Sequence, residues 1–499
     1  GESEVCPEIV PFAENALRAA AGDRARTGGF VVNTTIDPIL QAQARTALRD
    51  GLDNYAKRHG LEPPLVDQKR SAWGDPFVGA PRVNGIYVGV VKAVDDASNS
   101  IDVAVGSKVG TVLLGHEQRY NPHHLPPSQF TRIGAVLRVG VLDDSAADGN
   151  IALRLELGPQ AALIALDVRT REVLALVGGY DGVAGGLDRA TQTKRQPGST
   201  FKPITYSYAL HSHLITPATV LHVRHEHDKE GPIGVRVRQA LAESNNRAAE
   251  FVFKESGAKQ VVDWAHQLGV ESKLGADKSL ALGSYEVSVL ELANAYATFA
   301  SGGDALSPVM IRSVQGVEGA LPLPPVAPRR QVMTVDEAYM ITSLLRSVVQ
   351  EGTGMGAQRV GRPVAGKTGT TNRVKDAWFI GYSTEIVAAV WVGYDDALPL
   401  GRGEQGSATA LPMWVNFMKQ AHEHRPATEF PRPAGVIEVS IDPRTGLLPY
   451  PGEQGLIQEE FLDGTVPTQA AVPDAGAAKV RQDPPDGGAP VRGGIDPHP

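Results

Sequence analysis

The chain has 499 residues, which is too long for one compact core, so we expect two to four domains. Its 42% hydrophobic and 21% charged content exclude disorder of the whole chain. A net charge of −8 without a dense basic run argues against a nucleic-acid partner, and the single cysteine, Cys6, excludes both a disulfide framework and a thiolate metal cluster. No apolar run approaches the ~18 residues that a membrane-spanning helix needs. Because the chain starts with Gly1 rather than Met and shows no signal peptide, we expect it to be a processed or excised piece of a longer protein.

The first predicted elements are a strand and a helix. After an irregular start, "FVVNTTID" at 30–37 predicts a strand. Asp37 and Pro38 suit an N-cap and a first helical turn. Apolar residues then recur on one face, which predicts a helix over 38–57; they are Leu40, Ala44, Ala47, Leu48, Leu52 and Tyr55. We assign residues 1–69 to a linker region.

Residues 70–155 change to a β pattern. Short β-branched runs alternate with Asp, Asn, Gly and Pro, which suits a small OB-like barrel. The five predicted strands are 85–94, 100–105, 108–114, 136–142 and 151–157. A spacer that positions the next domain is the simpler interpretation of this OB-like β-domain, and a binding module is the alternative.

The rest of the chain predicts an α+β domain over 156–425. Two strands form a hairpin within 161–180, and helical segments fill much of 203–300, including 288–300. Three more strands follow, so a helical middle separates two early from three late strands of one antiparallel sheet; they are predicted at 363–371, 376–383 and 385–395. A β segment that begins at 435–446 makes 426–467 a C-terminal extension, and the Pro/Gly/Ala-rich residues 468–499 predict a disordered tail.

Ser-x-x-Lys occurs twice, as Ser199–Lys202 and Ser256–Lys259. The second copy follows a helical stretch and has Gly257 where a helix C-cap belongs, so we interpret it as solvated surface. The first copy, in "QPGSTFKP", opens a helix, where a spacing of three places both side chains on one face. A serine needs a neighbouring base to become a nucleophile, so this pair is a candidate for Ser199 with Lys202 as its base. Taken alone, a cap and a surface lysine remain the simpler interpretation. Pro203 has no N–H, which predicts an imperfect first turn.

Two further motifs are each weak alone. Ser244–Asn246, in "ESNNR", is a loop or cap in isolation. Lys367–Gly369, in "AGKTGTT", predicts an edge strand on which Thr368 points away from the face of Lys367. Gly369 lacks a side chain, so another backbone or a ligand can approach there. The order of the three motifs and their separations of 45 and 123 positions make a chance match improbable.

The motifs and longer segments together resemble class A penicillin-binding proteins. The resemblance covers about 155–467 and, more loosely, the chain from residue 30; examples are "RATQTKRQPGSTFKPITY", "LALGSYEVSVLELANAYATFASGG", "AGKTGTTNRVKDAWFIGYS" and "VAAVWVGYDD". It implies a penicillin-binding-protein/serine β-lactamase-like fold, with a five-stranded antiparallel sheet and a helical subdomain. No match to the family's glycosyltransferase domain precedes residue 30, so the expected chain is the transpeptidase part without that domain.

The resemblance also implies roles. Ser199 attacks the carbonyl between two terminal D-alanines of a peptidoglycan stem peptide, and Lys202 is the base. Ser244 relays a proton to the leaving D-alanine, while Asn246 holds the amide of the acyl chain. Lys367 supports this proton path and favours neutral Lys202. Thr368, Gly369, Thr370 and Thr371 form the substrate-binding strand, and the N–H groups of Ser199 and Thr370 form an oxyanion hole. The residues of this site are therefore Ser199, Lys202, Ser244, Asn246, Lys367, Thr368, Gly369, Thr370 and Thr371.

The implied activity is D,D-transpeptidation through a serine acyl-enzyme, on the periplasmic, extracytoplasmic face of the bacterial inner membrane. β-Lactams would be inhibitors, cell-wall regulatory proteins are expected partners, and no cofactor is implied. The resemblance also implies a membrane anchor in the parent protein, outside this chain. The alternatives are a D,D-carboxypeptidase, a serine β-lactamase and a catalytically silent cell-wall scaffold. A metal site of His222, His225, His227 and Asp228 is disfavoured, because the spacing matches no standard ligand set.

Overall fold

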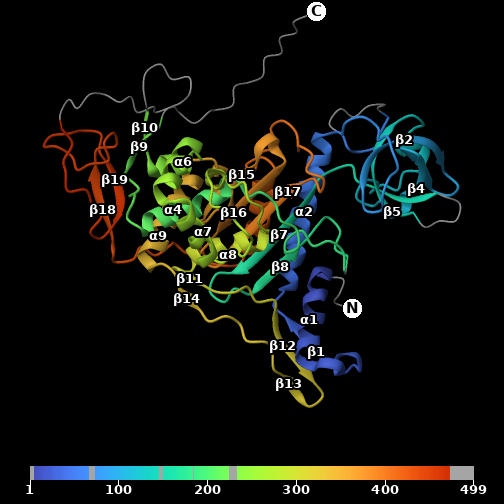
Figure 1. Ribbon diagram of the computed structural model, residues 1–499, viewed down its shortest axis with the longest axis horizontal. Helices are drawn as coiled ribbons and strands as arrows, with labels where there is room; N and C mark the ends of the chain where they lie inside the picture. Colours follow the sequence, from blue (N-terminus) through green and yellow to red (C-terminus); the bar gives the residue numbers. More distant parts are fainter. Residues whose placement is uncertain (1–4, 67–72, 145–149, 184, 224–232, 473–499) are drawn as a thin grey trace, which may run out of the picture.

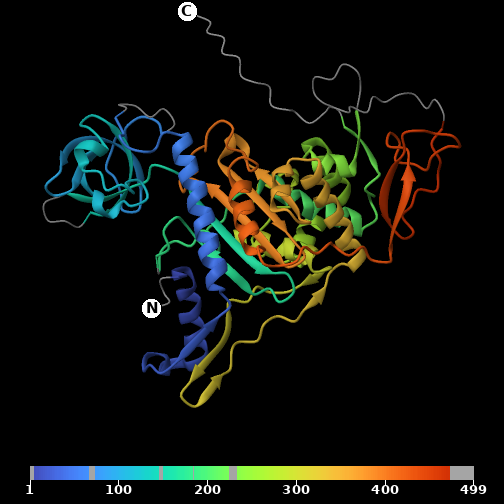
Figure 2. The same ribbon diagram turned by 180° about the vertical axis from the view of Figure 1, so that it is seen from behind.

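The computed structural model describes residues 5–66, 73–144, 150–183, 185–223 and 233–472. Figure 1 shows three regions in a row: a β-barrel, a central unit of helices and sheet, and a small β region toward the C-terminus. The view from behind in Figure 2 shows the same order. Within the described ranges, no helix has the length and apolar character that crossing a membrane requires.

The central unit is built on one five-stranded sheet. Its strand order is β15-β16-β17-β7-β8, and all neighbouring strands are antiparallel. The strands are β7 (Gln160–Asp167), β8 (Val173–Val177), β15 (Ala365–Thr370), β16 (Asp376–Tyr382) and β17 (Ile386–Gly393). The prediction that two early and three late strands share one antiparallel sheet is therefore confirmed. β15, which carries Lys367, is an edge strand.

Helices cover both faces of this sheet. Side chains alternate along each strand, so Ile164 and Trp391 belong to one hydrophobic core, whereas Ala165 and Val390 belong to the other. Burial on both faces explains why the strands read as continuous apolar runs. The first core is shared with α4 (Lys202–His211), α5 (Val237–Ala242), α6 (Asn246–Ser256), α7 (Ala258–Gln267), α8 (Val289–Ala300) and α9 (Val335–Gln350). The second is shared with α2 (Pro38–Arg58) and α10 (Ala410–Ala421).

Helix α2 forms as the sequence predicts. The Asp37 side chain accepts hydrogen bonds from the N–H groups of Ile39 at 2.9 Å and Leu40 at 3.1 Å. Such an N-cap stabilises a helix by about 1 kcal/mol. The predicted apolar face is buried, and α2 ends one residue beyond the predicted helix. Figure 2 shows α2 lying along the sheet, between the barrel and the central unit.

The barrel closes in the order β2-β3-β4-β6-β5. Its pairs are antiparallel except for β4 and β6, which run parallel. Every predicted strand is present, and alternate residues point into the barrel core. The strands are β2 (Ile86–Asp95), β3 (Ser100–Val105), β4 (Lys108–Leu113), β5 (Val136–Asp143) and β6 (Ile151–Leu155), and α3 (Pro127–Phe130) lies between β4 and β5 in the chain. The predicted OB-like barrel is confirmed.

The N-terminal segment differs from the prediction. Residues Val10–Ala21 form helix α1 instead of an irregular start. Only Ala21 of this helix is fully buried, but its partly buried residues, such as Ala13, Leu17 and Ala20, recur at helical spacing, so the sequence carried a helical pattern that the prediction missed. The predicted strand at 30–37 is confirmed in shorter form as β1 (Val31–Thr34), which pairs with β12 (Ile311–Gly316). β12 pairs in turn with β13 (Gly319–Leu321).

The C-terminal extension is a hairpin of β18 (Val436–Ile441) and β19 (Ile457–Leu462). Ile441 and Phe461 pack with Ala218 in a small separate core. β18 confirms the β segment predicted to begin near residue 435. The other short strands are β9 (Val220–Val223), β10 (Ile233–Arg236), β11 (Asp304–Ala305) and β14 (Arg330–Gln331).

Candidate active site

Ser199 lies in a short 3-10 helix, η5 (Gly198–Phe201), that leads into α4 at Lys202. The N–H of Lys202 donates to the Ser199 carbonyl, so the two residues share one turn. Pro203 is the second residue of α4 and has no N–H, and the turn before it is 3-10 in form, as the sequence predicts. Ser199 is half-buried, whereas Gly198 and Thr200 on either side are buried.

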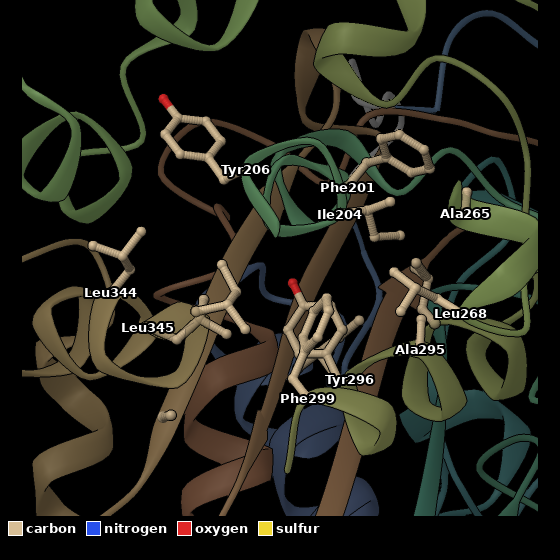
Figure 3. Close-up of a cluster of buried hydrophobic side chains, with 14 of the residues drawn as sticks. Phe201, Ile204, Tyr206, Ala265, Leu268, Ala295, Tyr296, Phe299, Leu344 and Leu345 are labelled. Atoms are coloured by element: carbon tan, nitrogen blue, oxygen red, sulfur yellow. The ribbon is translucent and has the colours of Figure 1, made fainter. Parts of the chain in front are cut away.

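Contacts from the core fix the backbone of this segment. The Tyr296 hydroxyl of α8 donates to the Thr200 carbonyl at 2.8 Å, and Trp378 Nε1 of β16 donates to the Gln196 carbonyl at 2.9 Å. Figure 3 shows Phe201 and Ile204 in the hydrophobic cluster that also contains Tyr296. The serine is thus presented by a segment anchored to both a helix and the sheet.

Lys202 is completely buried. Its Nζ donates to the Ser244 carbonyl and to Asn246 Oδ1, each at 2.6 Å, and lies 3.2 Å from Ser244 Oγ. Burial lowers the pKa of Lys202 to about 7, and the negative charge of Glu250 opposes this shift. A neutral amine has two N–H groups and one lone pair. The two N–H groups match the two oxygens that accept from Lys202, the Ser244 carbonyl oxygen and Asn246 Oδ1. The geometry therefore suits Lys202 to accept a proton from a hydroxyl.

Ser244 and Asn246 lie on the turn between α5 and α6. Ser244 has a φ of 60°, a left-handed conformation that non-glycine residues seldom adopt. Its N–H donates to the Leu241 carbonyl at 3.1 Å, which fixes the turn to α5. Asn246 begins α6 and is exposed. Because its Oδ1 faces Lys202, its amide nitrogen points away from the lysine and can donate to a ligand.

Lys367 lies on the edge strand β15 and is fully buried. Its Nζ donates to the Thr368 carbonyl at 3.1 Å. Burial holds the pKa of Lys367 well below its usual range, and the positive charge of Lys202 lowers it further. Burial is the cause that lowers the pKa of Lys202, which agrees with the expectation that desolvation favours its neutral form, whereas the effect of the Lys367 charge on Lys202 stays a prediction.

Two glycines let η5 lie directly against β15. A Cβ on Gly369 would be 2.7 Å from the Pro197 carbonyl oxygen and 2.8 Å from Thr200 Cγ2. Gly198 has a φ of +55°, and a Cβ there would be 2.8 Å from the Thr370 carbonyl oxygen. The close approach predicted at Gly369 is confirmed, and Gly198, which precedes the Ser-x-x-Lys motif, allows a second one. The backbones of Ser199 and Thr370 consequently lie side by side.

The backbone direction at Thr370 suits an oxyanion donor. The Thr371 N–H donates to the Asp376 carbonyl of β16 at 3.1 Å. Successive N–H groups of an edge strand alternate in direction, so the Thr370 N–H points away from β16 toward the open edge. Ser199 is the second residue of η5, where an N–H has no intrahelical acceptor. The N–H groups of Ser199 and Thr370 therefore lie on two backbone segments that adjoin each other.

The threonines of β15 differ in their partners. Thr370 Oγ1 accepts a hydrogen bond from the Gly406 N–H at 3.0 Å, and Thr368 Oγ1 lies 2.7 Å from Thr353 Oγ1. Thr353 and Gly406 were missed by sequence reasoning.

Thr371 departs from its predicted role in substrate binding. Its hydroxyl donates to Asp376 Oδ2 at 3.1 Å and accepts from the Asp376 N–H at 3.0 Å. Both hydrogen-bonding functions of the hydroxyl are therefore engaged in closing the turn that follows β15, and the side chain is buried.

The second Ser-x-x-Lys copy was assigned to the surface, and this is correct only for its lysine. Lys259 has a side-chain exposure of 77%. Ser256 is only 5% exposed, because the last turn of α6 packs into the helical core. Gly257, with a φ of 83°, ends α6 as predicted.

The structure offers no metal centre in the ranges it describes. His222 is exposed on β9, and the other three residues of the disfavoured site, His225, His227 and Asp228, lie outside the described residues.

A cavity of about 730 Å³ lies between the barrel and residues near 181–189, and none of the predicted site residues lines it.

Comparisons with known proteins agree with this geometry. The family model described as "Penicillin binding protein transpeptidase domain" matches residues 161–411. Penicillin-binding protein 1A of Pseudomonas aeruginosa is 29% identical over 97% of this chain and 68% of the relative. The corresponding protein of Neisseria lactamica is 33% identical over 86% of this chain, which spans 57% of that relative's length.

A solved structure is similar over most of the chain. The crystal structure of penicillin-binding protein 1A from Haemophilus influenzae superposes with a TM-score of 0.68 and 26% identity, over 93% of this chain and 76% of that one. The family model covers half of the chain, including the five strands of the sheet and all three motifs. This chain belongs to the penicillin-binding-protein transpeptidase family.

Proposed function

We propose that this chain is a peptidoglycan D,D-transpeptidase that acts through an acyl-enzyme on Ser199. One observation carries the proposal: a completely buried lysine, Lys202, lies one turn after a half-buried serine and bonds Ser244 and Asn246. A buried lysine with a pKa near 7 is a base at physiological pH, and burial is what produces it.

In the proposed acylation, Ser199 Oγ forms a bond to the carbonyl carbon between the two terminal D-alanines. The hydroxyl proton passes to Lys202 Nζ. The N–H groups of Ser199 and Thr370 stabilise the negative oxygen, a contribution of about 3 kcal/mol per donor. The C–N bond then breaks, and the departing D-alanine amine receives a proton through Ser244.

The second half-reaction joins two stem peptides. An amine of another stem peptide attacks the ester carbonyl, its proton returns through the same groups, and Ser199 is released with a new amide bond formed. The Thr368 and Thr370 hydroxyls are proposed to bind the terminal carboxylate of the donor, beside the amide of Asn246. A β-lactam enters the same path, since opening its ring acylates Ser199.

We further propose that residues 156–425 form the catalytic domain, 70–155 the positioning barrel and 426–467 an extension of the catalytic unit. The proposed place of action is the periplasmic side of the inner membrane, where peptidoglycan and cell-wall regulatory proteins are found.

Labelling by a fluorescent penicillin tests the proposal. We expect one label per folded wild-type chain and none in Ser199→Ala, with unchanged circular dichroism and melting temperature. A well-folded wild-type protein that takes no label would overturn the proposal.

Two assays separate the related activities. Rapid, repeated hydrolysis of nitrocefin would instead identify a β-lactamase, because a transpeptidase holds its acyl group. With a D-alanyl-D-alanine stem peptide and an added D-amino acid, we expect an exchange product. Hydrolysis alone would indicate a carboxypeptidase.

A further inference from the structure

We propose that the ion pair between Glu459 of the C-terminal hairpin and Arg238 of α5 positions the Ser244–Asn246 turn for catalysis. Glu459 and Arg238 are thus positioning residues, and the hairpin β18–β19 is a working part of the catalytic unit. The inference rests on the proposed function of Ser199 and deepens it, because it names the device that holds the groups around Lys202.

The ion pair is buried and has two-point geometry. Arg238 Nη2 donates to Glu459 Oε1 at 2.6 Å, and Arg238 Nε lies 2.9 Å from Oε1 and 3.0 Å from Oε2. The Glu459 side chain is 1% exposed and that of Arg238 is 15% exposed. Arg236 adds a second contact to Glu459 Oε2 at 3.3 Å. Charged groups seldom occupy such a place without a partner, because an unpaired buried charge is strongly unfavourable.

The same arginine joins α5 to α9. Arg238 Nη1 donates to the Ser343 carbonyl at 3.1 Å, to Ser343 Oγ at 3.0 Å and to Ser347 Oγ at 2.9 Å. The hairpin reaches α9 independently, since Tyr339 donates to Glu460 Oε1 at 2.8 Å and Ser343 Oγ donates to Glu460 Oε2. One guanidinium group therefore fixes the positions of the hairpin, α5 and α9 relative to one another.

Both helices lead from this point to the active site. Ser244 follows Arg238 by six residues, and Thr353 follows Ser347 by six. The two ends meet, because the Thr353 N–H donates to the Ala242 carbonyl at 3.0 Å. Thr353 in turn contacts Thr368 on β15, while Ser244 contacts Lys202. A shift of α5 would therefore move the partners of Lys202 away from it.

The pH dependence of acylation reports such a shift. The charged groups that act on the two lysines are Glu250 on α6, which raises the pKa of Lys202, and Lys202 itself, whose positive charge lowers the pKa of Lys367. None of these belongs to the hairpin, so Glu459 affects Lys202 through the turn and not through its own charge. If the turn loosens, water reaches Lys202, its ammonium form becomes less unfavourable and its pKa rises toward the ordinary lysine value.

The test compares Glu459→Gln with Glu438→Gln in the full chain. Glu438 lies on the same hairpin but is exposed and pairs with the exposed Arg432. Acylation by a fluorescent penicillin is measured from pH 5 to 9, together with hydrogen–deuterium exchange. In Glu459→Gln we expect the acid limb of the rate profile to move up by about one pH unit, which lowers the rate at pH 6 about tenfold. Exchange should rise at 241–246, and Glu438→Gln should match the wild type.

Each outcome decides the inference. A folded Glu459→Gln with unchanged pH profile and unchanged exchange at 241–246 overturns it. If this variant does not fold, Ser347→Ala replaces it, with a smaller shift in the same direction expected and no shift overturning the proposal. A wild-type chain that takes no label contradicts the proposed function instead, and the exchange result then still decides whether Glu459 holds the turn.

Discussion

The two Ser-x-x-Lys segments have the same spacing and opposite environments. Ser199 and Lys202 lie in one continuous turn, and the lysine is completely buried among carbonyl oxygens. Ser256 and Lys259 are separated by Gly257 into two helices, and the lysine is 77% exposed and paired with Asp263 at 2.5 Å. In the second pair it is the serine that is buried.

This contrast shows that the motif supplies only the two side chains. Whether the lysine can act as a base depends on burial and on partners that come from elsewhere in the chain. Ser244 and Asn246 are more than 40 residues from Lys202, at separations of 42 and 44. A copy of the motif without these partners is an ordinary helix junction.

Removing each lysine in turn gives the largest expected difference between the two segments. Lys202→Met should lower the rate constant of acylation by penicillin on the order of 1,000-fold, because a general base contributes roughly 100- to 10,000-fold. Lys259→Met should leave the rate within about twofold of the wild type. Stopped-flow labelling measures both. Equal effects of the two substitutions would remove the distinction between the segments.

The pH dependence of acylation sharpens the comparison further. Lys202 is a base only when neutral, and burial lowers its pKa to about 7. Below pH 7 its neutral fraction falls about tenfold per pH unit, so we expect the acylation rate at pH 5 to be about one hundredth of its plateau. The Lys259→Met variant should give the same profile. A rate that stays flat from pH 5 to 9, with circular dichroism unchanged, would exclude Lys202 as the base.

The glycine beside each serine offers a smaller contrast. Gly198 and Gly257 both have positive φ, so alanine at either position costs about 1 kcal/mol of stability. A Cβ at Gly198 also meets the Thr370 backbone, whereas a Cβ at Gly257 meets the flexible end of Gln260. We therefore expect Gly198→Ala to slow acylation about tenfold and Gly257→Ala to leave it unchanged. Thermal melts and labelling rates test the pair, and slowing in both variants would count against the specific contact.

The smallest expected effect concerns the buried serine of the second segment. Ser256 Oγ has no hydrogen-bond partner among the described residues. Ser256→Ala should therefore stabilise the protein by up to about 1 kcal/mol without changing acylation. Ser207 is a suitable control, because its buried hydroxyl donates to the Ile204 carbonyl and accepts from Trp264 Nε1. Ser207→Ala should destabilise by about 1–2 kcal/mol in urea unfolding; a loss of stability in both variants contradicts the assignment.

Much of the fold was predictable because its signals are local. The strands of the sheet and barrel are apolar runs bounded by turn residues, and α2 carries a cap and a clear apolar face. Helix α1 has no side-chain cap, and the prediction missed it although its partly buried residues recur at helical spacing. The three motifs could also be placed on their elements, because the segments around them carry local signals of helices, turns and strands.

The remainder depends on contacts between distant residues. Thr371 was predicted to belong to the substrate-binding strand, but its hydroxyl donates a hydrogen bond to Asp376. The contact between Thr370 and Gly406 spans 36 positions, and that between Arg238 and Glu459 spans 221. No pattern within a short window encodes such pairs, because they form only when the sheet, helices and hairpin assemble.

Mapping the acylated serine tests the central claim most directly. The folded chain is incubated with benzylpenicillin, and its intact mass and peptide map are recorded. The account predicts one penicillin adduct per chain, located on Ser199 within the peptide that contains Lys202, and no adduct on Ser256. An adduct on Ser256 or elsewhere, or a folded chain without any adduct, would contradict it.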